Sequence, residues 1–272
     1  LATMQSGAPA IPFAEGYGES ASVAVTADTT LDLTPPGWIT VDIADGGTAV
    51  VRIDFAAGDP AAASAERLPG RPSGAQAWGY ARGGSVRVPV EPGDYVVTVH
   101  RGLAWEAVTR DVSIASDEDV SLSADLQPAY AHPGVLLVDP HSHAAPSGDG
   151  EISMEDRLSV HAAHGVQVHF GTDHDHVADY RPLLSSMGLD GTMASIVADE
   201  VSPVMRGHFN AYPLTEAPDL TNNGAPAWWE QVWSTNELFD QIFAMDEDVL
   251  VQVNHPAGNK GMFGFSDYDV ET

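Results

Sequence analysis

The chain contains no cysteine and few basic residues. None of its 272 residues is Cys, so disulfides and thiolate ligands are excluded, and any metal must be bound by His, Asp or Glu. Lys and Arg total 11 against 39 Asp and Glu, which gives a formal net charge of −28. Because a field of this sign repels nucleic acid, we expect no nucleic-acid partner. Small-molecule substrates remain compatible with it.

Long apolar runs are also missing. No stretch approaches the roughly 20 apolar residues that a membrane-spanning helix needs, so we expect no membrane insertion. The self-repulsion of so acidic a chain opposes compaction unless salt screens it. Together with the absence of cysteine, the charge predicts a secreted or periplasmic (extracytoplasmic) protein of a saline environment.

Residues 1–130 have the pattern of an antiparallel β-sandwich that serves as an accessory domain. Short alternating runs rich in Val, Thr and Ile are separated by turn clusters such as Asp45-Gly46-Gly47. Residues 58–74, rich in Ala, Pro and Gly, are predicted to form a long loop. The predicted strands are residues 21–25, 38–43, 49–55, 85–90, 95–100, 104–114 and 120–126.

Residues 131–272 form a second predicted domain, in which strands alternate with helices. The strands are expected at residues 135–138, 166–170, 192–197, 208–212 and 249–253. Helices are expected from Ser153 to about residue 164, over about 180–187, and from Ser234, where Ser234 and Glu237 form a capping box. Alternation of this kind is typical of parallel βα units, whose loops and chemistry lie at one rim.

Five histidines mark the ends of these predicted strands. His141 and His143 follow the first strand, His174 follows the second, His208 opens the fourth and His255 follows the fifth. In an extended segment His141 and His143 point the same way, so both imidazoles can reach one ion. For each histidine the alternative is a surface or structural role. Their shared position favours metal ligation.

Four further residues are candidates for the site. Asp149 lies in a Gly-containing turn that can bring its carboxylate back to the rim, and Glu200 ends the third strand, where a carboxylate can bridge two ions. Asp173 is predicted to orient His174, and His176 is our candidate for proton delivery to a leaving group. The alternatives are an ordinary turn for Asp149, a solvated acid for Glu200 and a solvated loop residue for His176.

In this order the motifs resemble the PHP (polymerase and histidinol phosphatase) superfamily over about residues 133–263. Residues 172–177, 207–214 and 254–256 are similar to the CehA/McbA-type metallohydrolases, a group that includes carbaryl hydrolases and often carries a β-rich domain in front. The segments that carry the resemblance are Asp139-Pro140-His141-Ser142-His143, Asp149-Gly150, Thr172-Asp173-His174, Glu200, His208 and Asn254-His255-Pro256.

The resemblance implies a distorted seven-stranded β/α barrel holding two or three divalent ions, usually zinc, manganese or iron. The family completes its site with a later Asp and His, and no such pair appears before Thr272. We therefore expect the barrel to be incomplete in this chain and the remainder of the same polypeptide to complete it. The residues that match the family's metal ligands by position are His141, His143, Asp149, His174, Glu200, His208 and His255.

The sequence thus predicts a metal-dependent hydrolase that uses a metal-activated water on a small molecule. The bond is an ester, amide, carbamate or phosphoester. The second half contains only four basic residues, which slightly favours neutral substrates over phosphates. The alternative is a non-catalytic extracellular protein, in which the β-sandwich serves adhesion or assembly and the second half is a degenerate PHP domain.

Overall fold

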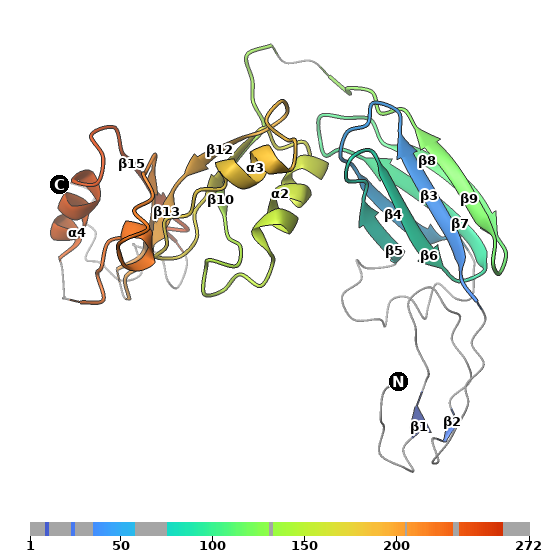
Figure 1. Cartoon of the computed structure of the whole chain (residues 1–272), viewed down its shortest axis with the longest axis horizontal. Helices are drawn as coiled ribbons and strands as arrows, with labels where there is room; N and C mark the ends of the chain where they lie inside the picture. The colour runs from blue at the N-terminus through green and yellow to red at the C-terminus, as the bar shows by residue number, and fades with distance from the viewer. Residues whose placement is uncertain are drawn as a thin grey trace. The chain divides into compact units, whose positions relative to one another are not determined.

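The fold is rich in β-structure, and none of its sheets closes into a barrel within the described residues. The computed structural model describes residues 9–10, 23–24, 35–57, 75–130, 133–204, 206–230 and 234–257 (Figure 1). It divides into two compact units, Leu1–Ala131 and His132–Thr272. The predicted loop 58–74 and most of the predicted strand 21–25 lie outside the described residues. Two short strands, β1 (Pro9–Ala10) and β2 (Val23–Ala24), pair with each other.

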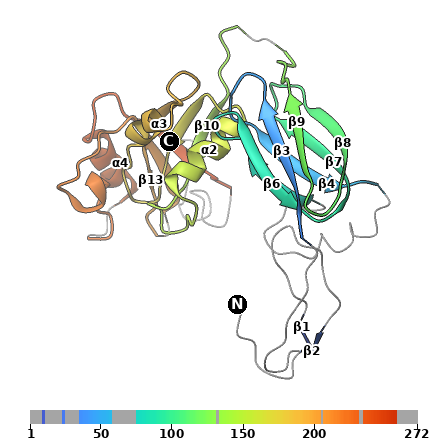
Figure 2. The same ribbon diagram turned by 45° about the vertical axis from the view of Figure 1, so that its right-hand side comes forward.

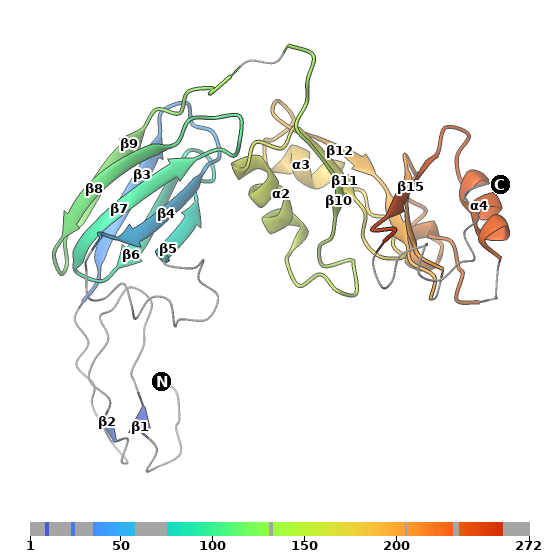
Figure 3. The same cartoon turned by 180° about the vertical axis from the view of Figure 1, so that it is seen from behind.

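The first unit contains two larger sheets, seen from two sides in Figures 2 and 3. One has the order β6-β3-β9 and the other the order β5-β4-β7-β8. Alternate residues of strands in both sheets, such as Ile39, Ile53 and Val97, contribute to one buried core, as the period of two along a strand requires. The strands are β3 (Gly37–Ile43), β4 (Val50–Phe55), β5 (Ala75–Tyr80), β6 (Ser85–Val90), β7 (Gly93–His100), β8 (Val108–Ile114) and β9 (Asp119–Ala124).

Two predictions for this unit were wrong. The pair β3 and β9 is parallel, although all the other pairs in its two larger sheets are antiparallel. Strand β5 was missed because its sequence, Ala-Gln-Ala-Trp-Gly-Tyr, contains no β-branched residue and begins beside the long Gly- and Pro-rich segment. Its place is set by pairing with β4.

The second unit begins with a parallel sheet, as predicted. Strands β10 (Val138–Ser142), β11 (Val168–Gly171) and β12 (Ala194–Val197) lie in that order, with α2 (Met154–Ala163) and α3 (Arg181–Ser186) between them in sequence (Figure 3). The side chain of Ser153 accepts a hydrogen bond from the backbone N–H of Asp156 and so caps α2. Strand β10 starts later than predicted, so His141 lies within the strand.

The rest of the unit forms an antiparallel sheet, so the prediction of parallel strands throughout was wrong. Its strands are β13 (Asp199–Val201), β14 (His208–Tyr212) and β15 (Leu250–Asn254). Only residues 202–207 join β13 to β14, and this is too short for the crossover that a parallel pair requires. The connection to β15 contains the 3-10 helix η1 (Thr221–Gly224) and α4 (Thr235–Phe243), which has the predicted capping box at Ser234.

The two sheets of this unit meet at the candidate site. Only Ala198 separates β12 from β13, and His174, after β11, forms a parallel bridge with Glu200 on β13. The loop after β11 is thereby fixed beside the antiparallel sheet. Among the described residues, no helix is both long and apolar enough to cross a membrane.

Candidate metal centre

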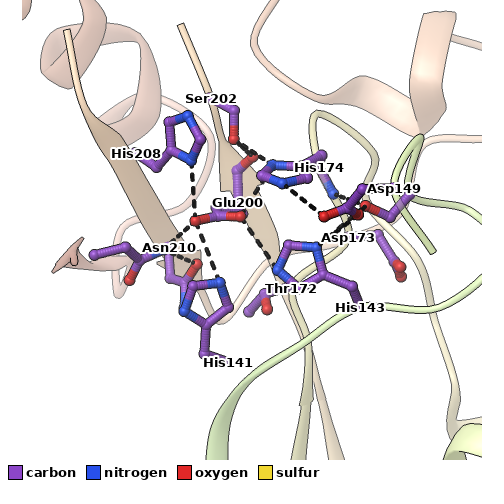
Figure 4. A network of polar contacts seen from close by, with 12 residues as sticks. His141, His143, Asp149, Thr172, Asp173, His174, Glu200, Ser202, His208 and Asn210 are labelled. Carbon is purple, nitrogen blue, oxygen red and sulfur yellow. Dashed lines mark hydrogen bonds and ion pairs between the residues drawn. The ribbon is translucent and has the colours of Figure 1, made fainter. Parts of the chain in front are cut away.

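Glu200 is a buried carboxylate surrounded by imidazoles. Its residue is 1% exposed, and each of its oxygens faces a different set of histidines. Oε1 lies 3.2 Å from Nε2 of His141, 3.4 Å from Nδ1 of His208 and 3.4 Å from Nε2 of His255. Oε2 lies 3.2 Å from Nε2 of His143 and 2.9 Å from Nδ1 of His174. Figure 4 shows Glu200 between the labelled histidines.

Asp149 extends this cluster on the side of His143 and His174. Its Oδ1 lies 3.2 Å from Nδ1 of His143, and its Oδ2 lies 3.4 Å from Nε2 of His174 (Figure 4). Ser147 donates a 2.6 Å hydrogen bond to Oδ1, so the turn predicted from the glycines does bring this carboxylate to the histidines. Its side chain is 58% exposed, the most of any group in the cluster.

All seven predicted ligands therefore converge. Six of them form three overlapping groups whose ligand atoms lie within 4.8 Å of one another, and His255 joins through its contact with Glu200. Nitrogen and carboxylate oxygen donors at this spacing are suited to divalent cations such as zinc. The groups are His141, His143 and Glu200; His143, Asp149 and His174; and His174, Glu200 and His208.

Two buried atoms of the cluster support this fit. Within the described part of the chain, Oε2 of Glu200 and Nδ1 of His208 are buried, and their contacts of 2.9–3.4 Å with the facing groups of the cluster lack hydrogen-bond geometry. A buried polar atom without a partner costs about 1–3 kcal/mol. A cation between these side chains would satisfy both atoms, so the arrangement of the side chains is suited to a bound metal ion.

Two asparagines hold the central carboxylate. Nδ2 of Asn254 donates to Oε1 of Glu200 (2.8 Å) and to Oδ1 of Asn210 (2.5 Å). Asn210 in turn donates to the backbone oxygen of Pro140 (2.9 Å), on the strand that carries His141. Neither asparagine was predicted from the sequence. The signals were there, because Asn254 directly precedes His255 and Asn210 shares one face of β14 with His208.

The cluster is electrostatically coupled. Burial alone would raise the pKa of Glu200, but the surrounding imidazoles outweigh burial and hold this pKa far below its ordinary value. Burial likewise opposes the charged form of His143 and His174, yet the Glu200 carboxylate raises the pKa of both above 6.5. Without a cation, protons on these imidazoles therefore offset the buried negative charge.

This coupling predicts a pH dependence of the metal-free chain. A histidine whose pKa is raised by folding stabilises the fold below its unfolded pKa, and this stability is lost as the pH rises through the folded pKa. The lowered pKa of Glu200 changes the stability of the fold only in strongly acidic solution. We therefore expect the thermal midpoint of the second unit, measured with chelator present, to fall as the pH rises from about 7 to about 9, above the range in which the lowered pKa of the buried His169 adds stability with rising pH.

With saturating zinc or manganese the trend should differ, because deprotonated imidazoles are the form that binds cations. We expect the midpoint of the metal-loaded chain to stay level or rise over the same interval. A metal-free second unit that gains stability between the two pH values would contradict the coupling described above.

Asp173 lies beneath the cluster and does not face it. The residue is fully buried, its Oδ1 accepts from the backbone N–H of Ala144 (2.7 Å), and its Oδ2 accepts from the hydroxyl of Tyr180 (2.7 Å). Both oxygens are thus occupied by structural donors. Asp173 thus positions the chain just after His143, and the hydrogen bonds of its carboxylate go to Ala144 and Tyr180 in place of the His174 ring; its catalytic role stays a prediction.

Removal of the Tyr180 hydroxyl tests this role. Tyr180→Phe leaves Oδ2 of the buried Asp173 without its donor, so we expect a loss of about 1–3 kcal/mol in the free energy of unfolding of the second unit. Chemical denaturation measures it. Tyr212→Phe is the matched control, because it removes only a 3.3 Å hydrogen bond at a half-buried position. Equal effects of the two substitutions would argue against the Asp173 anchor.

His176 contacts Asp199 and Asn223, and its predicted part in proton delivery stays a prediction. Its backbone N–H donates to Oδ1 of Asp199 (3.0 Å), and its Nε2 lies 3.3 Å from Nδ2 of Asn223. The ring is therefore fixed beside the segment that carries η1. Its neighbourhood offers no direct support for proton delivery to a leaving group at the cluster.

Comparison with known proteins adds no assignment: no protein-family model matches the chain, and no curated protein is similar enough to count as a match.

Proposed function

We propose that the chain is a metal-dependent hydrolase of the PHP type, similar to the CehA/McbA metallohydrolases. The observation that carries the proposal is the ring of five imidazoles around the two oxygens of one buried carboxylate. So many titratable groups in one place are uncommon in a purely structural site, and clusters of this kind are typical of functional sites. The PHP barrel and the secreted, saline setting belong to this proposal as expectations.

The donor atoms suggest how the ions would be held. His141, His143 and Glu200 would hold one ion, and Oε1 of Glu200 with His208 and His255 would hold a second. A third would lie at Asp149 and His174. Imidazole and carboxylate ligands without sulfur suit zinc, manganese or iron.

Bound divalent cations would lower the pKa of a water molecule and polarise the scissile bond. The residues of the chain provide the frame for this chemistry. Asn254 fixes the orientation of Glu200, and Arg157 donates its Nε–H to the backbone oxygen of His143 (2.7 Å). Asp149 and His255 have the most exposed side chains, 58% and 43%, so substrate would approach past them.

The substrate proposed is a small neutral ester, amide or carbamate, with a phosphoester as the second choice. Recognition of phosphate commonly uses Arg or Lys. Among the described residues, Arg157 is the basic residue in contact with a cluster residue, and it uses one of its five N–H donors on a backbone oxygen. His176 takes no part in this proposal. Within the described residues β15 pairs with β14 alone.

The direct test is hydrolysis by protein loaded with zinc, manganese or iron(II). We expect turnover of naphthyl carbamate esters above that of p-nitrophenyl phosphate, and loss of both activities on chelation. Bound metal without turnover of either substrate class would favour a non-catalytic protein with a degenerate PHP domain. Absence of both bound metal and turnover would overturn the proposal.

A further inference from the structure

Ser202 makes two contacts that together determine the proton position on His174. Its hydroxyl donates to the backbone oxygen of Glu200 (2.8 Å), and the same oxygen lies 2.6 Å from Nδ1 of His174 (Figure 4). A carbonyl oxygen can only accept, and a hydroxyl has one hydrogen to donate. Toward His174, Ser202 can therefore only accept. The proton of the neutral imidazole must then lie on Nδ1.

The other groups around His174 agree with this assignment. Oε2 of Glu200, also an acceptor, lies 2.9 Å from the same Nδ1. The opposite nitrogen, Nε2, faces Oδ2 of Asp149 at 3.4 Å. With the proton on Nδ1, the lone pair of Nε2 points toward a second negative group. For the neutral ring such an arrangement is favourable when a cation lies between them, the place that a second ring proton takes in the metal-free chain at lower pH.

His143 has the same pattern with a different serine. Ser147 donates its hydrogen to Oδ1 of Asp149 (2.6 Å), and both of these oxygens lie 3.2 Å from Nδ1 of His143. Since both neighbours of Nδ1 accept, this nitrogen also carries the proton. Nε2 of His143 then directs its lone pair at Oε2 of Glu200, 3.2 Å away.

We propose that Ser202 and Ser147 are positioning residues that fix His174 and His143 in the Nδ1–H tautomer, so that each presents Nε2 to a divalent cation. The inference rests on the proposed function only in that the site binds metal. Which nitrogen of a histidine binds metal is set by the hydrogen bond that the other nitrogen makes. Loss of such a partner typically weakens metal affinity by about 10–100-fold.

Ser202→Ala isolates the hydroxyl. The backbone N–H of Ser202 donates to Oδ1 of Asp175 (2.9 Å), and this contact survives the substitution. Ser202→Thr restores a hydroxyl and serves as the conservative variant. Ser195→Ala is the matched control, because it removes a serine hydroxyl from another histidine, His169, whose Nδ1 lies 2.9 Å from it.

The test is long-range 1H–15N correlation of histidine rings in the metal-free chain, at a pH where His174 is neutral, followed by zinc titration. We expect Nδ1–H at His174 in the unsubstituted protein, a mixture of tautomers with about 10–100-fold weaker zinc binding in Ser202→Ala, and recovery in Ser202→Thr. Ser195→Ala should change neither result.

An Nε2–H tautomer at His174 in the unsubstituted protein would overturn the inference by itself, whether or not Ser202→Ala folds. So would a Ser202→Ala variant with unchanged tautomer and unchanged zinc affinity. Both readouts are independent of hydrolysis. A protein with the predicted tautomer, tight zinc binding and no turnover would therefore contradict the proposed activity and leave this inference standing.

Discussion

Glu200→Gln should remove most of the bound metal and reduce hydrolysis by about 10³-fold or more. Among the described residues Glu200 is the one carboxylate that contacts all five imidazoles, and its two oxygens face different histidines. A neutral amide has one oxygen that can bind metal. Its NH₂ group would face imidazole nitrogens whose lone pairs are needed to bind the cation. Charge stabilisation by a metal supplies several kcal/mol in the transition state, and each 1.36 kcal/mol corresponds to a tenfold change in rate.

The measurement is metal content by elemental analysis together with turnover of the carbamate substrate. Glu247→Gln provides the control, since it makes the same chemical change at an exposed residue between α4 and β15. A Glu200→Gln protein that keeps its full complement of metal would show that the carboxylate is not the bridge. One that keeps metal and loses only turnover would require a catalytic role for Glu200 in place of a ligating one.

Metal binding should raise the thermal midpoint of the second unit alone, by roughly 5–10 °C. A ligand present at 100 times its Kd, and bound only by the folded state, stabilises that state by about 2.7 kcal/mol. For a domain of this size each kcal/mol moves the midpoint by a few degrees. All seven proposed ligands belong to residues 132–272, so the unfolding of residues 1–131 should not respond.

Differential scanning calorimetry with and without chelator measures both transitions in one sample, and the first unit serves as the internal control. If zinc, manganese and iron all leave the thermal midpoint of the second unit unchanged, the cluster does not bind these metals and the proposal is contradicted. Equal shifts of both transitions would point to a nonspecific effect of cations on a chain of net charge −28.

Local patterns predicted much of the fold, and long-range pairing explains the rest. Alternating burial in β3 and the capping box of α4 depend on neighbours in the sequence, and both agree with the structure. The direction of β14 depends on the short connection 202–207, and the place of β5 depends on its partner β4. Val135 and Leu136 were expected inside a strand, yet they precede β10 and are exposed.

Some residues of the candidate site could likewise be predicted from the sequence, and others could not. Histidines and carboxylates at strand ends are chemically distinctive, so His141 and Glu200 could be selected from the sequence alone. Ser202 and Asn254 could not, because serine and asparagine form hydrogen bonds throughout proteins and acquire a role only from what lies beside them. Asp173 was selected for its place next to His174, but its side chain turns toward Ala144 and Tyr180.

Anomalous X-ray diffraction from metal-loaded crystals gives both the position and the element of each ion, and so decides whether Glu200 binds metal. We expect peaks at bonding distance, about 2.0–2.2 Å, from both oxygens of Glu200, with imidazole nitrogens completing each coordination shell. Full metal occupancy elsewhere in the chain, with no peak beside Glu200, would contradict this expectation.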